Sequence, residues 1–267
     1  MVTPLSQLTS LSGKTAIVTG GAMGIGQGIT MRLHEAGANV VIADLDETAA
    51  TQTASELNSV RPSSAFPFKT DVSKADSVVG LVQETVGHFG GIDILVNNAG
   101  IYPPAPLASM TEEQFMKVID VNLRGCFLTT KAVSDQMIKQ ARGGKIVNIT
   151  SIDALHPSMV GLAHYDASKH GLWGFTKNTA LELAQHKIWV NAVAPGGIAT
   201  PGVAKMQGPT QPGVDMKASQ EAFMSKIPMH RMGEPDDIGK VVLFLASGLS
   251  SYMTGSQIVV DGGALLS

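Results

Sequence analysis

Seven short runs of apolar, mostly β-branched residues recur from one end of the chain to the other, and they constrain the fold more than any other feature. The runs span residues 14–19, 39–44, 65–69, 92–97, 144–150, 187–194 and 255–263. They are nearly continuous in apolar residues rather than alternating, which is typical of strands buried on both faces of a parallel sheet. The pattern predicts an α/β fold, a Rossmann-like, doubly wound parallel sheet of about seven strands with helices on both faces.

The stretches between these runs carry helix signals. Residues 26–36 and 75–89 repeat apolar side chains at helical spacing. Thr111 and Gln114 fit a capping box at the start of another helix, and Pro235 stands where a first helical turn tolerates proline. No Pro-, Gly- or Ser-rich linker divides the chain, so we expect one domain over residues 1–267.

One region, at about residues 200–230, departs from this alternation. It is rich in Gly, Pro and Met and has no clear period. It is either a surface insertion or a substrate lid whose methionines, Met206 among them, act as adaptable apolar contacts. Its position after a strand, at the edge of an α/β sheet where ligands bind, favours the lid.

Composition excludes several kinds of site and partner. The net charge is −3 and no run of Lys and Arg stands out, so we expect neither a nucleic-acid nor a membrane partner. The single cysteine, Cys126, permits no intramolecular disulfide and is expected to be a small buried residue. No cluster of histidines and carboxylates has metal-ligand spacing. Without a signal peptide or a membrane-spanning run, the expected location is the cytoplasm.

A glycine-rich loop follows the first predicted strand. Gly20, Gly24 and Gly26 precede a predicted helix, and Asp44 ends the second predicted strand. Glycines let the backbone approach a pyrophosphate closely, and the helix start offers free N–H groups and the positive end of a dipole. A strand, a glycine loop, a helix and a later acid together indicate a dinucleotide site, although the spacing is G-x-x-x-G-x-G rather than G-x-G-x-x-G.

Further motifs follow in a fixed order along the chain. They are Asp71-Val72, the sequence NNAG at residues 97–100, Asn122, Ser151, the Tyr165/Lys169 pair, Pro195-Gly196 and the sequence VDGG at residues 260–263. With the glycine loop, they resemble the short form of the short-chain dehydrogenase/reductase family over essentially the whole chain. The resemblance implies an oxidoreductase that interconverts a secondary alcohol and a ketone with a nicotinamide cofactor, and a homotetramer.

The resemblance also implies which residues bind the cofactor. Asp44 would bind the adenosine ribose hydroxyls and repel a 2′-phosphate. Family members that prefer NADP usually carry a basic residue where this chain has Met23 or Leu45. We therefore expect NAD. The expected contacts are Gly20, Met23, Gly24, Ile25, Gly26, Asp44, Leu45, Asp71, Val72, Asn98, Ala99, Gly100, Tyr165, Lys169, Pro195, Gly196, Ile198 and Thr200.

Tyr165 and Lys169 are four residues apart in a predicted helix, and therefore lie on one face of it. A lysine ammonium beside a tyrosine favours the phenolate. Lowering the tyrosine pKa from ~10 to about 7 takes some 4 kcal/mol, whereas one exposed ion pair contributes less than about 1 kcal/mol. The site must therefore be partly desolvated and hold more than one source of positive charge. We expect Tyr165 to act as the general acid/base.

The family assigns roles to the neighbouring residues. Ser151 would hydrogen-bond the substrate oxygen, and Lys169 would lower the tyrosine pKa and bind the nicotinamide ribose. Asn122 would hold a water molecule behind the lysine. Asp153 stands where many members have a small or apolar residue. It either faces the pocket, where it would bind a second hydroxyl or an amine of the substrate, or caps the following turn as a surface carboxylate.

The same residues leave the substrate open. A polyol, a cyclic or hydroxysteroid-like alcohol and a 3-oxoacyl thioester are all candidates. A sugar-nucleotide epimerase or dehydratase would usually have another glycine spacing and a longer substrate domain. A non-catalytic NAD(H) sensor or scaffold would typically lack the serine, the tyrosine or the lysine, all of which are present at Ser151, Tyr165 and Lys169.

Overall fold

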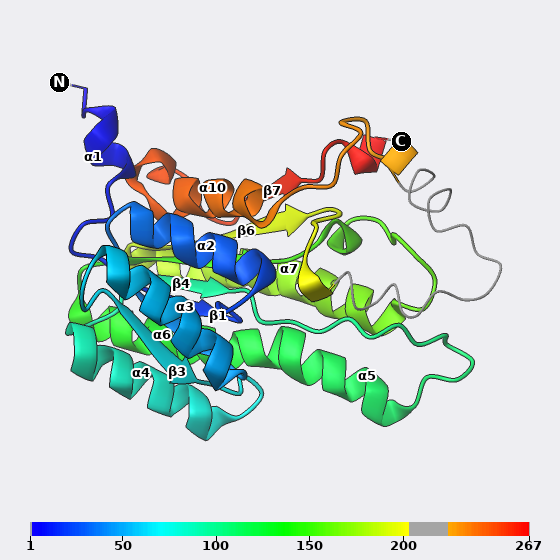
Figure 1. Cartoon of the computed structure of the whole chain (residues 1–267). Coiled ribbons are helices and arrows are strands. Elements are labelled where there is room, and N and C mark those ends of the chain that lie inside the picture. Colours follow the sequence, from blue (N-terminus) through cyan, green and yellow to red (C-terminus); the bar gives the residue numbers. More distant parts are fainter. Residues whose placement is uncertain (1, 203–223, 267) are drawn as a thin grey trace.

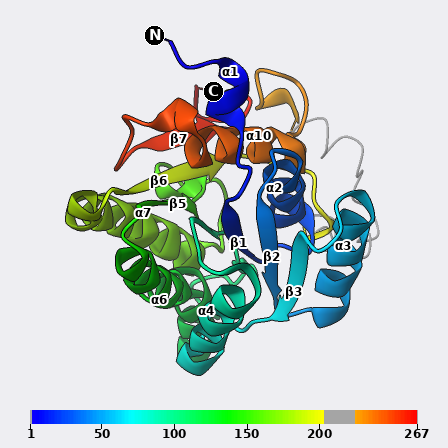
Figure 2. The ribbon, with the colours of Figure 1, turned by 90° about the vertical axis from the view of Figure 1, so that its left-hand side faces the viewer.

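The protein is built on one sheet of seven parallel strands. A computed structural model describes residues 2–202 and 224–266. The strands run in the order β3-β2-β1-β4-β5-β6-β7 (Figures 1 and 2), and each neighbouring pair is parallel. They are β1 (Thr15–Thr19), β2 (Asn39–Asp44), β3 (Ala65–Lys69), β4 (Ile94–Asn97), β5 (Gly144–Ile149), β6 (Ile188–Pro195) and β7 (Gln257–Val260). The predicted fold class is confirmed.

Helices cover both faces of this sheet. One face carries α2 (Gly24–Glu35), α3 (Glu47–Val60) and α10 (Pro235–Ala246), and the other α4 (Ala75–Phe89), α6 (Gly125–Gln140) and α7 (Ala163–Leu183) (Figure 2). The shorter α1 (Leu5–Thr9) precedes β1, and α5 (Glu112–Ile119) runs into a π-helical turn, η1 (Asp120–Arg124). Thr111 begins α5 with the predicted capping box. No helix in the part of the chain that the structure describes is long and apolar enough to cross a membrane.

The central strands are buried on both faces, which explains their continuous apolar sequence. In β1, Ala16 and Val18 pack against α2 and α10, whereas Ile17 packs toward α4 and α6. In β2, Val40 packs into the core on the side of α2 and α10, and Val41 packs into the core on the side of α4 and α6. The valine and isoleucine side chains among them each contribute about 1.5–3 kcal/mol when fully buried. A substitution by a polar residue at either set of positions would therefore disrupt a core.

The strand order reverses between β1 and β4, and this reversal positions the site. From β1 the sheet grows through β2 to β3 in one direction, and from β4 to β7 in the other. In open α/β sheets, ligands bind at the carboxyl ends of the strands at such a switch point. Thr19 joins the two halves there, because its hydroxyl donates to the carbonyl of Val96 and accepts from the N–H groups of Asn98 and Ala99.

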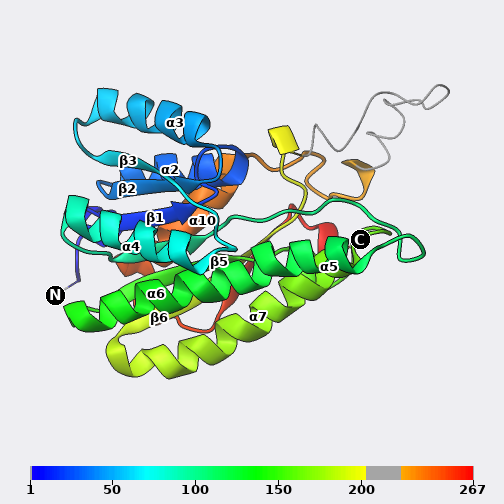
Figure 3. The ribbon, with the colours of Figure 1, turned by 90° about the horizontal axis from the view of Figure 1, so that it is seen from below.

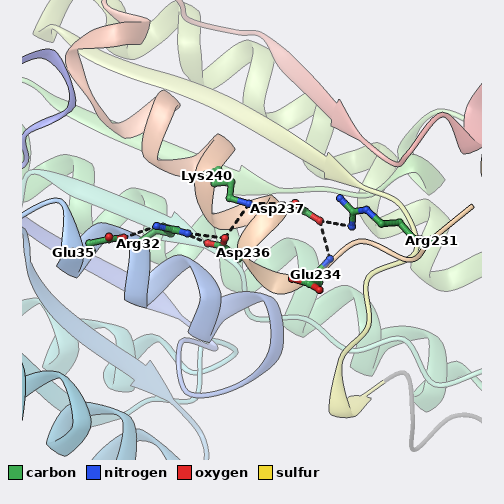
Figure 4. A network of polar contacts seen from close by, with 7 residues as sticks. All are labelled: Arg32, Glu35, Arg231, Glu234, Asp236, Asp237 and Lys240. Carbon is green, nitrogen blue, oxygen red and sulfur yellow. Dashed lines mark hydrogen bonds and ion pairs between the residues drawn. The ribbon is translucent and has the colours of Figure 1, made fainter. Parts of the chain in front are cut away.

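An ion-pair network joins α2 to α10 on the first face. The Arg32 guanidinium binds both carboxylate oxygens of Asp236, and Lys240 lies 3.0 Å from the same carboxylate (Figure 4). Asp237 pairs with Arg231 at 2.8 Å. The hydrogen bond from Arg32 lowers the pKa of Asp236 to about 2, and the one from Arg231 does the same for Asp237. Both carboxylates therefore stay charged near neutral pH, and Asp236 ties α10 to the helix that begins at the glycine loop.

Candidate active site

The glycine loop connects β1 to the start of α2 with little side-chain bulk. Gly20 and Gly24 have positive φ angles of 61° and 54°, which glycine adopts most readily. A Cβ atom on Gly26 would lie 1.9 Å from the carbonyl oxygen of Gly20, so no larger residue fits there. A Cβ atom on Gly24 would come within 3.3 Å of the Thr200 side chain. The loop and the segment after β6 therefore face each other closely, and the residues present fit a cradle for a pyrophosphate.

Asp44 and Asn98 hold this loop from two sides. The Asp44 carboxylate accepts a hydrogen bond from the Ala22 N–H at 3.0 Å. The Asn98 amide donates to the carbonyls of Thr19 and Gly20, each at 3.0 Å. Asp44 therefore lies beside the loop, as a residue that binds the adenosine ribose would. Its contact with the adenosine ribose stays a prediction.

The surroundings of Asp44 offer little positive charge. Met23 and Leu45 are 45% and 65% exposed at the rim of the loop, and neither carries a charge. Lys69 stands opposite Asp44 in the sheet register, but its ammonium group lies 3.8 Å from the Glu47 carboxylate. A cofactor phosphate placed beside Asp44 would be repelled by its carboxylate. Of these residues only Lys69 carries a positive charge, and it is paired with Glu47.

Other predicted cofactor residues gather at the same edge of the sheet. Pro195 ends β6, and the Gly196 N–H donates to the Val260 carbonyl at 3.0 Å. Ile198 is buried. Val72 is buried against Gly125. Their contact with a cofactor stays a prediction, as does that of Ile25, Asp71 and Gly100. Met206 and most of the predicted lid lie outside the described residues.

The Tyr165/Lys169 pair lies on the inner face of α7. The Lys169 ammonium is 5.5 Å from the centre of the Tyr165 ring and donates to the Ile149 carbonyl at 2.8 Å. Lys169 is 4% exposed, and burial lowers its pKa to about 8. Cys126 is buried as expected, and burial raises the pKa of its thiol to about 11.

Burial dominates the acidity of Tyr165. It raises the pKa of Tyr165 above its ordinary value, while a hydrogen bond with Ser151 lowers it and the charge of Asp153 raises it further. The expected fall in pKa is therefore absent from the chain by itself, since desolvation outweighs the hydrogen bond with Ser151. A second positive charge beside the phenol would be needed to reverse the balance.

Ser151 is bound to Asp153 on the loop that follows β5. Its hydroxyl donates to the Asp153 carboxylate at 2.8 Å and accepts from the Asp153 N–H at 3.1 Å. The second carboxylate oxygen accepts from the Ser158 N–H at 2.8 Å. Asp153 is only 5% exposed. It does cap the following turn, but it is a buried group joined to a candidate catalytic residue, not a surface carboxylate.

Asn122 lies in the π-helical turn η1 and is fully buried. Its amide donates to the Ile101 carbonyl at 2.9 Å and accepts from the Ile101 N–H at 2.8 Å. A Cβ atom added to Gly100 would lie 3.3 Å from Asn122 and 3.7 Å from the Lys169 ammonium. Asn122 therefore reaches the region behind the lysine. Single π-turns often occur at functional sites, and this one was not anticipated.

Tyr102 is the residue that the sequence argument missed. Its ring packs edge-on against the ring of Tyr165, with centroids 5.8 Å apart. It follows the sequence NNAG by two positions, on the loop that leaves β4 at the switch point. That position was the available signal. Among the described residues, no three His, Cys, Asp or Glu side chains are placed to hold a metal ion.

Known proteins that are similar to this chain include reductases and a dehydrogenase/reductase of solved structure. The family model described as enoyl-(acyl carrier protein) reductase matches residues 20–264. A 3-oxoacyl-[acyl-carrier-protein] reductase of Thermotoga maritima is 40% identical over 96% of this chain and 99% of its own. An (S)-acetoin-forming diacetyl reductase of Staphylococcus epidermidis is 39% identical over 94% and 98%. A short-chain type dehydrogenase/reductase structure from Mycobacterium marinum superposes with a TM-score of 0.88 at 38% identity, covering 97% of this chain and 98% of that one. The chain belongs to the short-chain dehydrogenase/reductase family of oxidoreductases.

Proposed function

We propose that the chain is an NAD(H)-dependent alcohol dehydrogenase or carbonyl reductase that interconverts a secondary alcohol and a ketone. The observation that carries this proposal is the meeting of Ser151, Tyr165 and Lys169 at the carboxyl edge of the sheet. The glycine loop and Asp44 lie at the same edge. The names of the Thermotoga and Staphylococcus relatives, both carbonyl reductases, support the same reaction class.

Each of these residues has a separate role in the reaction. The loop N–H groups would hold the cofactor's pyrophosphate, Asp44 its adenosine ribose and Lys169 its nicotinamide ribose. When bound, the cofactor supplies the hydride acceptor or donor. In oxidation Tyr165 takes the proton of the alcohol, and in reduction it returns a proton to the ketone oxygen. Ser151 holds that oxygen beside Tyr165.

We predict that NADH is used in preference to NADPH, because the Asp44 carboxylate would repel a 2′-phosphate. Two unit charges 4 Å apart near a protein surface interact by up to ~4 kcal/mol. Asp44→Ala is therefore expected to lower the NADH:NADPH ratio of kcat/KM by at least about tenfold, which is about 1.4 kcal/mol. Initial rates with both cofactors over ketones, hydroxyketones and 3-oxoacyl esters measure the ratio. Asp46→Asn, two residues further on, is the matched control. A wild type that prefers NADPH would contradict the cofactor assignment.

A second candidate is the reduction of a 3-oxoacyl thioester. The Thermotoga relative, a 3-oxoacyl-[acyl-carrier-protein] reductase, favours it. The same panel distinguishes the two, since turnover confined to 3-oxoacyl esters would select the thioester reaction. Binding of NADH without turnover of any class would point instead to a sensor or scaffold.

A homotetramer is part of the proposal. Apolar side chains are exposed on the layer formed by α5, α6 and α7, which Figure 3 shows lying together. Phe127 on α6 is 47% exposed. We predict that light scattering gives a tetrameric mass and that Phe127→Glu reduces it, because a charge is costly in a buried interface. Val60→Glu, at an exposed apolar position on α3, is expected to leave the mass unchanged. A monomeric wild type would refute the assembly.

A further inference from the structure

The loop that carries Tyr102 is stiffened by its own sequence. Pro103 and Pro104 follow the tyrosine directly, and Pro106 comes two positions later. A proline fixes its own φ angle and confines the residue before it to extended backbone. Tyr102 and Pro103 each precede a proline, so the backbone has little freedom where the Tyr102 side chain branches from it. The sequence of this loop therefore favours a single position for the ring.

Hydrogen bonds fix the loop on both sides of Tyr102. Before it, the N–H and the carbonyl of Ile101 both bind the buried side-chain amide of Asn122, at 2.8 and 2.9 Å. After it, the buried Ala105 donates its N–H to the Gly161 carbonyl at 2.9 Å, which joins this loop to the loop after β5. Breaking such bonds leaves buried polar groups unpaired, which is costly. The ring of Tyr102 therefore cannot easily be displaced by a movement of its backbone.

The Tyr102 side chain extends from Tyr165 to the segment after β6. The centroids of the two tyrosine rings are 5.8 Å apart, with an interplanar angle of 61°. At the far end of the side chain, a Cβ atom added to Gly202 would lie 2.8 Å from the Tyr102 hydroxyl oxygen and 3.9 Å from its Cζ atom. The same Cβ atom would lie 3.7 Å from the Thr200 hydroxyl oxygen. Tyr102 therefore occupies the space between the candidate acid/base and the segment that also faces the glycine loop.

The phenol of Tyr102 is also near the phenol of Tyr165. Burial is the main cause of the raised pKa of Tyr165, and the charge of Tyr102 adds to it. An interaction between charges weakens with distance, so the two oxygens that titrate are near neighbours. A ketone whose oxygen reaches the Tyr165 hydroxyl must therefore place one of its two substituents beside Tyr102.

We propose that Tyr102 is a specificity-determining residue whose ring leaves room for only a methyl-sized group on one side of the reacting carbon, so that the site selects methyl ketones and the corresponding 2-alkanols. The substituent on the side of Tyr102 meets a ring that its loop holds in place. The other substituent extends away from that ring and is not restricted by it. The inference rests on the proposed alcohol–ketone function and specifies its substrate class.

The test compares two isomeric ketones, heptan-2-one and heptan-4-one. They contain the same atoms, but the smaller substituent of the carbonyl carbon is a methyl group in the first and a propyl group in the second. We would measure kcat/KM for the reduction of each with the preferred cofactor. The wild type is expected to favour heptan-2-one by at least about tenfold, because even one extra methylene in a closely fitting pocket has about that effect. Tyr102→Ala is expected to bring the ratio close to one by raising kcat/KM for heptan-4-one, a gain that a damaged fold cannot produce.

Two variants separate the ring from other effects of substitution. Tyr102→Phe keeps the ring and is expected to keep the preference for heptan-2-one. Tyr252→Ala removes the same atoms as Tyr102→Ala from a fully exposed position, and is expected to leave the ratio of the two ketones unchanged. Thermal unfolding of each variant checks that it is folded.

Gly202→Ala tests the position of the ring from its other side. The added methyl group would lie 2.8 Å from the Tyr102 hydroxyl oxygen, so it is expected to press the ring toward Tyr165. We expect kcat/KM for heptan-2-one to fall about fivefold or more, as overpacking of this kind predicts. Tyr102→Phe removes the oxygen and leaves the 3.9 Å contact with Cζ, which is an ordinary one. The double variant is therefore expected to recover the kcat/KM of Tyr102→Phe alone.

The outcomes that contradict the inference are distinct from failure of the proposed function. A wild type that reduces both heptanones equally well, or other ketones but neither heptanone, removes the substrate class. If Tyr102→Ala lowers both rates by the same factor, Tyr102 has only a structural role. If Tyr102→Phe does not relieve the effect of Gly202→Ala, the ring does not have the position that the inference requires. A wild type that reduces no ketone with either cofactor refutes the proposed function itself.

Discussion

Replacing Tyr165 by phenylalanine is expected to lower kcat by about 10²–10⁴-fold, the usual contribution of a positioned general acid/base. The substitution removes one oxygen atom and keeps the ring that packs edge-on against Tyr102. Because the fold and the glycine loop do not depend on that oxygen, NADH binding and thermal stability should stay near the wild-type values. Steady-state rates, an NADH titration and a melting curve make the comparison.

The chain provides its own control, since it has three tyrosines. Tyr252 is fully exposed near the start of β7, and Tyr252→Phe is expected to leave kcat unchanged. Tyr102→Phe removes a phenol next to the reacting one and should change kcat much less than Tyr165→Phe. If Tyr165→Phe retains wild-type kcat, another group moves the proton and the proposed mechanism is wrong.

The pH dependence of the wild type gives a second measure of the same residue. Oxidation requires the phenolate, so its kcat is expected to increase with pH, whereas reduction requires the phenol and should slow as pH rises. Burial raises the pKa of Tyr165 and lowers that of Lys169 to about 8. The Lys169 ammonium lies 5.5 Å from the centre of the Tyr165 ring, so the pH profile is expected to report both groups. In Tyr165→Phe the alkaline increase of the oxidation rate should disappear.

The sheet was predictable because strands that are buried on both faces have a continuous apolar sequence. The continuous apolar pattern of β1 exists because Ala16 and Ile17 enter different cores. The predicted strand at residues 92–97 begins at Ile94 instead. Asp93 precedes it, and its carboxylate accepts hydrogen bonds from the Thr15 N–H and from Arg142. These partners are distant in the sequence, so the boundary could not be derived from local pattern.

The same distinction separates the predicted parts of the site from the rest. The Tyr165/Lys169 pair was readable because both residues lie on one helix at a fixed spacing. Tyr102 and the contact between Asp153 and Ser151 depend on how loops fold against α7, which no local spacing encodes. The direction of the Tyr165 pKa was also hidden, because it depends on desolvation by the surrounding chain.

The second large effect is expected from Gly26→Ala, a change of one methyl group. The added Cβ atom would lie 1.9 Å from the Gly20 carbonyl oxygen and 2.6 Å from the Asn98 amide nitrogen. The first contact is with backbone, so the loop itself must move. Overpacking of this kind commonly costs 1–3 kcal/mol and occasionally more, and we expect about 3 kcal/mol here. A displaced cradle should also weaken NADH binding by about 100-fold, which is about 2.7 kcal/mol.

Gly87→Ala makes the same chemical change where the structure has room for it. Gly87 lies in α4, and apart from its chain neighbours and the nearby helix backbone, a Cβ atom there would meet no described atom within 4 Å. Because alanine is a better helix former than glycine by about 1 kcal/mol, this variant should be slightly more stable than the wild type. Chemical denaturation should therefore show a loss of stability in Gly26→Ala and a small gain in Gly87→Ala. NADH titration should show weaker binding in Gly26→Ala alone. Equal NADH affinity in both would mean that the close approach of Gly26 to Gly20 does not shape the cofactor site.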